Sequence, residues 1–91
     1  MTEQIDVNVE NIEFMTLLAS FTTSGMMALG KIPNPMTNEL DKNLDQAKYS
    51  IDILNMLKEK TMGNLTLEEE RALKNAISDL QINYVQELNQ K

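Results

Sequence analysis

Residues 14–30 form a run of seventeen residues without one charged side chain, between Glu13 and Lys31. This run restricts the fold more than any other part of the chain. Leaving its apolar surface in water costs about 25 cal/mol per Å². The run must therefore be covered by a core, by another chain or by a membrane.

The uncharged run predicts a helix over residues 11–29, which Gly30 ends and Pro33 prevents from continuing. Its apolar residues recur at helical spacing and cover well over half of the circumference. The remaining positions hold small hydroxyl side chains instead of charges. A surface helix usually has a narrower apolar stripe and a charged back, so we expect this helix to be covered on more than one side.

The residues in and before the run argue against membrane insertion and against secretion. Five of the seventeen residues are Ser or Thr, which makes a poor spanning helix. Residues 1–13 carry four acidic side chains and no basic one, whereas a signal peptide begins with positive charge. We expect residues 1–10 to form an acidic, flexible tail on a cytoplasmic protein.

Composition narrows the function classes. The 91 residues fit a single domain, over residues 11–88, and a chain this short buries only about two-thirds of its unfolded surface. The chain has no Cys and no His, so thiolate metal sites and the commonest general base are excluded together. Its net charge of −6 opposes binding to nucleic acid and to anionic membranes. We expect no cofactor and no catalytic residue.

A second helix is predicted over residues 39–61, capped by Thr37 or Asn38. It follows the sequence KIPNPMTN, which we interpret as a stiff corner set by Pro33 and Pro35. Apolar residues recur along the helix with the 4-3-4-3 spacing of a bundle seam. The seam consists of Leu40, Leu44, Ala47, Ile51 and Leu54. A second apolar patch on its back consists of Tyr49, Ile53, Met56 and Leu57.

A third helix is predicted over residues 66–88. Thr66 and Glu69 have the spacing of a capping box, and Gly63 supplies the turn before them. The apolar seam of this helix consists of Leu73, Ile77, Leu80 and Tyr84. The two matching seams predict an all-α fold in which the second and third helices form an antiparallel hairpin. The apolar first helix then completes a three-helix bundle.

Acidic side chains on the second helix leave two interpretations open. Asp41, Asp45 and Asp52 lie on one flank of residues 39–61. They form either a solvated face with pairs such as Lys48 with Asp52, or the oxygen ligands of a divalent-cation or small-ligand site. The chain offers no glycine-bearing loop that would gather these carboxylates, which favours the solvated face.

Three groups of short segments carry a family resemblance. They are Leu29-Gly30 with Pro33-Asn34-Pro35, Ala47-Lys48 with Ile51-Asp52, and Glu59-Lys60-Thr61 with Gly63-Asn64-Leu65-Thr66. With these segments the chain resembles the bacterial family called domain of unknown function 1844, over nearly all of residues 14–85. Asn38 and Gln81 depart from the family pattern, in which Gly and Arg are expected. The resemblance implies a small, cytoplasmic, helical bacterial protein and carries no catalytic residues.

The apolar surface left over by such a bundle favours an interaction protein, because large exposed apolar patches mark partner surfaces. We expect a homo-oligomer, a dimer, held by the first helix and the back of the second. The candidate interface residues are Phe14, Leu18, Phe21, Ser24, Gly25, Met26, Tyr49, Ile53, Met56 and Leu57. An unknown protein partner on the same surface is one alternative, and a ligand- or cation-binding protein is another. An enzyme, the remote alternative, would have to use Asp, Lys or Tyr alone.

Overall fold

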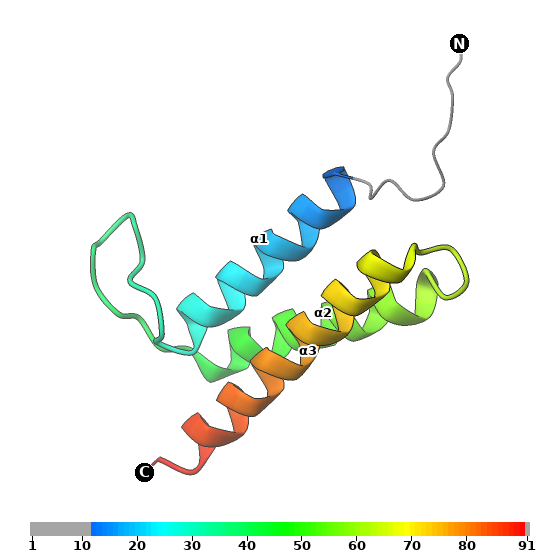
Figure 1. Cartoon of the computed structure of the whole chain (residues 1–91). Coiled ribbons are helices and arrows are strands. Elements are labelled where there is room, and N and C mark those ends of the chain that lie inside the picture. The colour runs from blue at the N-terminus through cyan, green and yellow to red at the C-terminus, as the bar shows by residue number, and fades with distance from the viewer. Residues whose placement is uncertain (1–11, 91) are drawn as a thin grey trace.

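The structure, a computed structural model, describes residues 12–90 and consists of three packed α-helices. They are α1 (Ile12–Ala28), α2 (Leu44–Lys60) and α3 (Leu67–Leu88). Figure 1 shows α2 and α3 as an antiparallel hairpin, and α1 packs against both. Within residues 12–90 the only strand-like pairing is one bridge between Asn34 and Glu39. The all-α fold is confirmed, and the expected tail, residues 1–10, lies outside the described residues.

The core lies where one face of each helix meets the other two. Leu18 of α1 is 4% exposed, whereas Leu54 of α2 and Leu80 of α3 are fully buried. The buried apolar residues are Leu18, Ala28, Leu29, Ala47, Ile51, Leu54, Leu73, Ala76, Ile77 and Leu80. Because these positions recur every three or four residues in α2 and α3, the predicted seams of both helices form the core.

Gly25 of α1 packs directly against Leu80 of α3. A Cβ atom at this position would lie 2.7 Å from Cδ2 of Leu80 and 3.0 Å from its Cδ1. Gly25 is itself buried, so the absence of a side chain lets the larger Leu80 fill the space between the helices.

The second helix begins five residues later than the sequence predicts, at Leu44 instead of Glu39. Asn43 is its N-cap, and the Asn43 side chain accepts a hydrogen bond from the Gln46 N–H at 3.1 Å. Thr37 and Asn38 are therefore not caps, and Leu40 is not part of the seam but lies in the preceding loop, 63% exposed. Asn38 has φ +61°, which ends any helical continuation.

Residues 29–43 form an ordered loop instead of a short corner. The carbonyl oxygen of Asn34 accepts hydrogen bonds from the N–H groups of Thr37 and Asn38, at 3.2 and 2.6 Å. The Asn34 side chain accepts a third, from the N–H of Met36 at 2.8 Å. Asn38 has a left-handed backbone, which explains the Gly expected there by the family resemblance, since Gly adopts that conformation without steric cost. Asn is the common substitute in this region.

The corner between α2 and α3 has the predicted cap. The Glu69 N–H donates to Oγ1 of Thr66 at 3.1 Å, and the Thr66 N–H donates to Oε1 of Glu69 at 2.9 Å. This reciprocal pair satisfies two backbone donors that a helix start otherwise leaves free. Gly63 has φ +84° in the turn before it. The capping box and the start of α3 are thus confirmed.

Candidate functional site

The outer face of α1 is exposed and carries no charge over about two and a half turns in the middle of the helix. We define this outer α1 face as Thr16, Ala19, Ser20, Thr23 and Ser24, all of which are exposed. Their side chains are small, so a partner's backbone can approach α1 closely. An exposed helix face usually carries charged residues, and this face departs from that rule.

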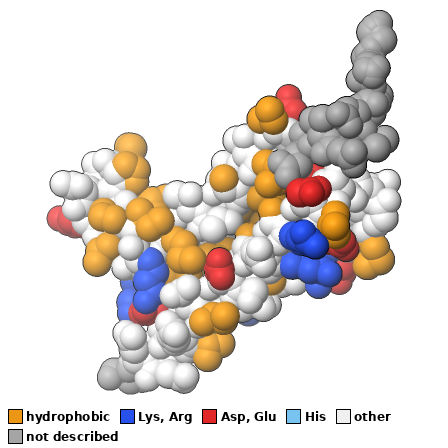
Figure 2. Space-filling view, in the orientation of Figure 1, with side chains coloured by type: hydrophobic (Ala, Val, Ile, Leu, Met, Phe, Trp, Pro, Cys, Tyr) orange, Lys and Arg blue, Asp and Glu red, His pale blue; other side chains and the backbone are white. Residues whose placement is uncertain are grey.

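An apolar groove lies beside this face, between α1 and α3. We call it the α1–α3 groove, and it has a volume of about 320 Å³. Its lining residues are Met15, Leu18, Ala19, Thr22, Thr23, Ala72 and Ala76. The Thr22 hydroxyl donates to the Leu18 carbonyl at 2.8 Å, which satisfies its donor within the helix. Figure 2 shows the groove as a hollow between the two helices with hydrophobic side chains in it.

The apolar patch predicted on the back of α2 is present and faces solvent. Tyr49 is 59% exposed and Met56 is 44% exposed, and Ile53 between them is half-buried. Their i, i+4, i+7 spacing places the three side chains on one side of α2. Leu57 packs partly against the core instead.

The structure divides the candidate interface residues into three groups. Ser24, Tyr49 and Met56 are exposed. Phe14, Phe21, Met26, Ile53 and Leu57 are half-buried. Leu18 and Gly25 are buried in the core, so the expectation that they contact a partner is wrong. Periodicity alone could not separate the inner from the outer side of α1, because both sides lack charge.

Sequence reasoning missed the exposed apolar residues on the loop after α1. We call Ile32, Met36 and Leu40 the loop tip, and they are 37%, 90% and 63% exposed. Figure 1 shows this loop projecting beyond the C-terminal end of α1. The sequence contained one signal of this exposure. Ile32 and Met36 are apolar residues beside Pro33 and Pro35, and a corner with only a structural role does not require them.

Two lysines fasten the base of this loop to the end of α3. Lys31 and Lys42 approach the carboxylate of Glu87 at 2.8 and 2.6 Å, and the Glu87 side chain is only 6% exposed. Hydrogen bonds from Lys31 and then Lys42 hold the pKa of Glu87 below its ordinary value. Lys31 lies near the start of the loop and Lys42 near its end, so the carboxylate of Glu87 holds the two ends of the loop together.

The acidic stripe predicted on helix two is not formed as one surface. Asp41 lies in the loop, Asp45 in the first turn of α2, and Asp52 pairs with Lys48 at 3.1 Å. The Asp52 hydrogen bond raises the pKa of Lys48 above its ordinary value. Within residues 12–90, no three acidic side chains come together in a way that could hold a metal ion.

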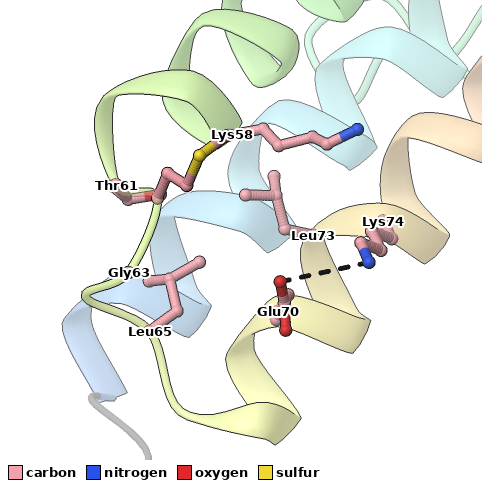
Figure 3. A pocket seen from close by; sticks show the side chains of 8 residues that line it. Lys58, Thr61, Gly63, Leu65, Glu70, Leu73 and Lys74 are labelled. Carbon is pink, nitrogen blue, oxygen red and sulfur yellow. Dashed lines mark ion pairs between the residues drawn. The ribbon is translucent and has the colours of Figure 1, made fainter.

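A second hollow lies at the corner between α2 and α3, with a volume of about 410 Å³. Figure 3 shows apolar Leu65 and Leu73 with charged Lys58, Glu70 and Lys74 around them. The complete lining is Lys58, Thr61, Met62, Gly63, Leu65, Glu70, Leu73 and Lys74. Lys74 and Glu70 form a 4.0 Å pair, and both side chains are more than half exposed. The Thr61 hydroxyl in the lining donates its hydrogen to the Leu57 carbonyl at 2.6 Å.

Comparisons with known proteins give one match. The sequence model of the family described as "Domain of unknown function (DUF1844)" matches residues 11–86. Searches of curated proteins and of solved structures give no match. None of the helices in the described part of the chain has the length and apolarity to cross a membrane.

Proposed function

This chain belongs to the family described as Domain of unknown function (DUF1844), and we propose that it is a non-catalytic helical interaction protein that self-associates as a dimer. The observation that carries the proposal is the outer α1 face, which is exposed yet uncharged. Its small side chains allow a second helix to approach closely, and the neighbouring exposed Leu17 gains free energy when it is covered.

The lack of charged side chains on the outer α1 face supports a second copy of the chain as the partner. Each copy has a net charge of −6, so two copies repel at most of their surfaces. The outer α1 face brings no charged side chain into contact when two copies meet through it. Its two-fold self-contact would also extend the small core of a short chain.

The patch of Tyr49, Ile53 and Met56 extends the proposed contact surface. Gln46, one turn earlier on α2, lines a hollow together with Ser24 and Met27 of α1. The patch therefore lies on the α1 side of α2. Lys48 and Asp52 face α3 across the opposite groove.

A charge placed on the outer α1 face should separate the copies without unfolding them. We expect the wild type to show about twice the 10.4 kDa chain mass in light scattering at micromolar concentration. Ser20→Lys should give a folded monomer, because it buries an unpaired charge only in the dimer. Circular dichroism reports whether the variant keeps its helices.

Ser78→Lys is the matched control, since Ser78 is an equally exposed serine on α3. It should leave the mass of the dimer unchanged. A monomeric wild type without detergent would refute self-association. Equal disruption by Ser20→Lys and Ser78→Lys would refute the assignment of the contact to α1.

The family resemblance is also the support for placing this protein in the bacterial cytoplasm. Cation binding through Asp41, Asp45 and Asp52 receives no support from the geometry, because those carboxylates lie apart along the loop and α2. A small-ligand role is the remaining alternative.

A further inference from the structure

The loop tip is an apolar surface that the fold holds in place. Met36 is 90% exposed, and Pro33 and Pro35 on either side of Asn34 each fix a backbone φ angle. The three hydrogen bonds accepted by Asn34 fix the turn that carries Met36. The loop therefore loses little conformational entropy when a partner binds it, which is the advantage of a preorganised surface.

The base of the loop is fixed relative to all three helices. The Asn43 N–H donates to the Ala28 carbonyl at 2.7 Å, which joins the start of α2 to the end of α1. Lys31 and Lys42 both reach Glu87 of α3. The direction in which Met36 points is thus set by the bundle as a whole.

The α1–α3 groove has the properties of a receiving site for such a side chain. Ala19, Ala72 and Ala76 leave room in it, and all of its lining residues are uncharged. An unbranched, flexible thioether adapts well to an irregular apolar hollow of this kind. Figure 2 shows hydrophobic side chains both on the projecting loop and in this groove.

The area of α1 alone is too small for a stable dimer. A helix of 17 residues is about 25 Å long and, with its side chains, about 10 Å wide. Stable interfaces bury about 800 Å² on each partner. Surfaces beside the outer α1 face must therefore take part. The loop tip, beyond the C-terminal end of α1, and the groove, which runs along α1 from Met15 to Thr23, are apolar surfaces next to it.

We propose that the loop tip of one copy inserts Met36 into the α1–α3 groove of a second copy, and that the exchange is reciprocal. This inference rests on the proposed self-association. If two α1 helices pack antiparallel about a two-fold axis, the loop after one α1 lies beside the N-terminal half of the other. Each copy then contributes one Met36 side chain and one α1–α3 groove to the same interface, as an isologous dimer requires.

A disulfide cross-link tests the contact directly, because the native chain contains no Cys. Met36→Cys protein is mixed with Ala19→Cys protein under mild oxidation, because Ala19 lines the groove in the N-terminal half of α1. Two cysteines link only when their Cα atoms lie within about 7 Å. The expected product is a covalent heterodimer that gel electrophoresis shows without reductant and that disappears with it. Met62→Cys, at the exposed corner between α2 and α3, replaces Met36→Cys in the control and should not link to Ala19→Cys.

Association is measured in parallel with Met36→Ser and its control Met62→Ser. Met62 is 73% exposed, so each variant removes a methionine that the single chain does not need for its core. We expect Met36→Ser to raise the dimer dissociation constant about tenfold or more, as for a central anchor residue. Met62→Ser should leave it within about twofold. Sedimentation equilibrium gives both constants.

The outcomes separate this inference from the proposed function. A wild-type dimer with no link between Met36→Cys and Ala19→Cys in the mixed variants and no response to Met36→Ser overturns the inference and leaves self-association standing. A wild-type monomer overturns both. A dimer that forms the link and weakens with Met36→Ser supports both.

Discussion

Single atoms decide the packing of α1 at Gly25. A Cβ atom there would come within 2.7 Å of Leu80, which is completely buried. Neighbouring Ser24, about 100° further round the helix, is exposed. One residue of difference therefore separates the core from the candidate partner surface.

Gly25→Ala should destabilise the fold by about 1–2 kcal/mol in the free energy of unfolding. Overpacking a filled core costs about 1–3 kcal/mol, and the better helix propensity of Ala returns up to about 1 kcal/mol. Urea denaturation followed by circular dichroism measures the change. Ser24→Ala, with only the propensity gain, is the control and should be neutral or slightly stabilising. Equal stability of the two alanine variants would mean that α1 and α3 lie further apart than described.

At the scale of elements, one carboxylate joins the loop to α3. Glu87 lies 45 residues from Lys42 and has two lysine partners. The helices themselves follow from capping residues and from the periodicity of apolar residues, which are local features of the sequence. This clamp is a long-range contact, and it sets where the loop tip points.

Glu87→Gln should reduce stability at neutral pH and lose this effect in acid. The pKa of Glu87 is lowered in the folded state from an ordinary value of 4.5, so its stabilisation is present above that value. It is lost as the pH falls through the lowered pKa, where the carboxylate gains a proton. Melting temperatures of wild type and Glu87→Gln should therefore differ most above the ordinary pKa of 4.5 and converge as the pH falls through the lowered pKa.

Glu70→Gln is the control for this titration, because Glu70 forms only an exposed 4.0 Å pair with Lys74. Pairs of that kind add little to stability. Its melting temperature should follow the wild type at every pH. A difference between wild type and Glu87→Gln that does not change with pH would show that the charge of Glu87 is not what holds the loop.

At the scale of the whole molecule, charge and apolar surface are kept apart. The net charge of −6 comes from residues 1–13 and from α3, whereas the charges of the loop and of α2 each sum to zero and residues 14–30 carry none. A dimer formed through α1 keeps its charges at the rim. The repulsion between two copies then acts at long range and is open to screening.

Added salt should therefore strengthen the dimer. Raising the ionic strength from about 0.01 to 0.15 M shortens the Debye length from about 30 to 8 Å, which screens the like charges. The dissociation constant from sedimentation equilibrium should fall by several-fold over this range. A contact made by ion pairs would respond in the opposite direction, and weakening by salt would count against an uncharged interface.

The sequence by itself determined the fold class, α3 and the family. Thr66 and Glu69 predicted a cap that their own backbone neighbours complete, and the seam from Leu73 to Leu80 needs only helical periodicity. Such signals depend only on residues close in sequence, so they can be interpreted without the tertiary structure. The uncharged run likewise showed that α1 needs cover, but it did not show on which side.

Tertiary structure decided the start of α2, the inner side of α1 and the exposure of the loop tip. Asn38 and Asn43 are both plausible caps by residue type, and the hydrogen bond from Asn43 to Ala28 together with the Glu87 clamp selects the second. Gly25 faces inward because Leu80 fills the space beside it. Each of these outcomes depends on residues far apart in the chain, whose contacts no local spacing records.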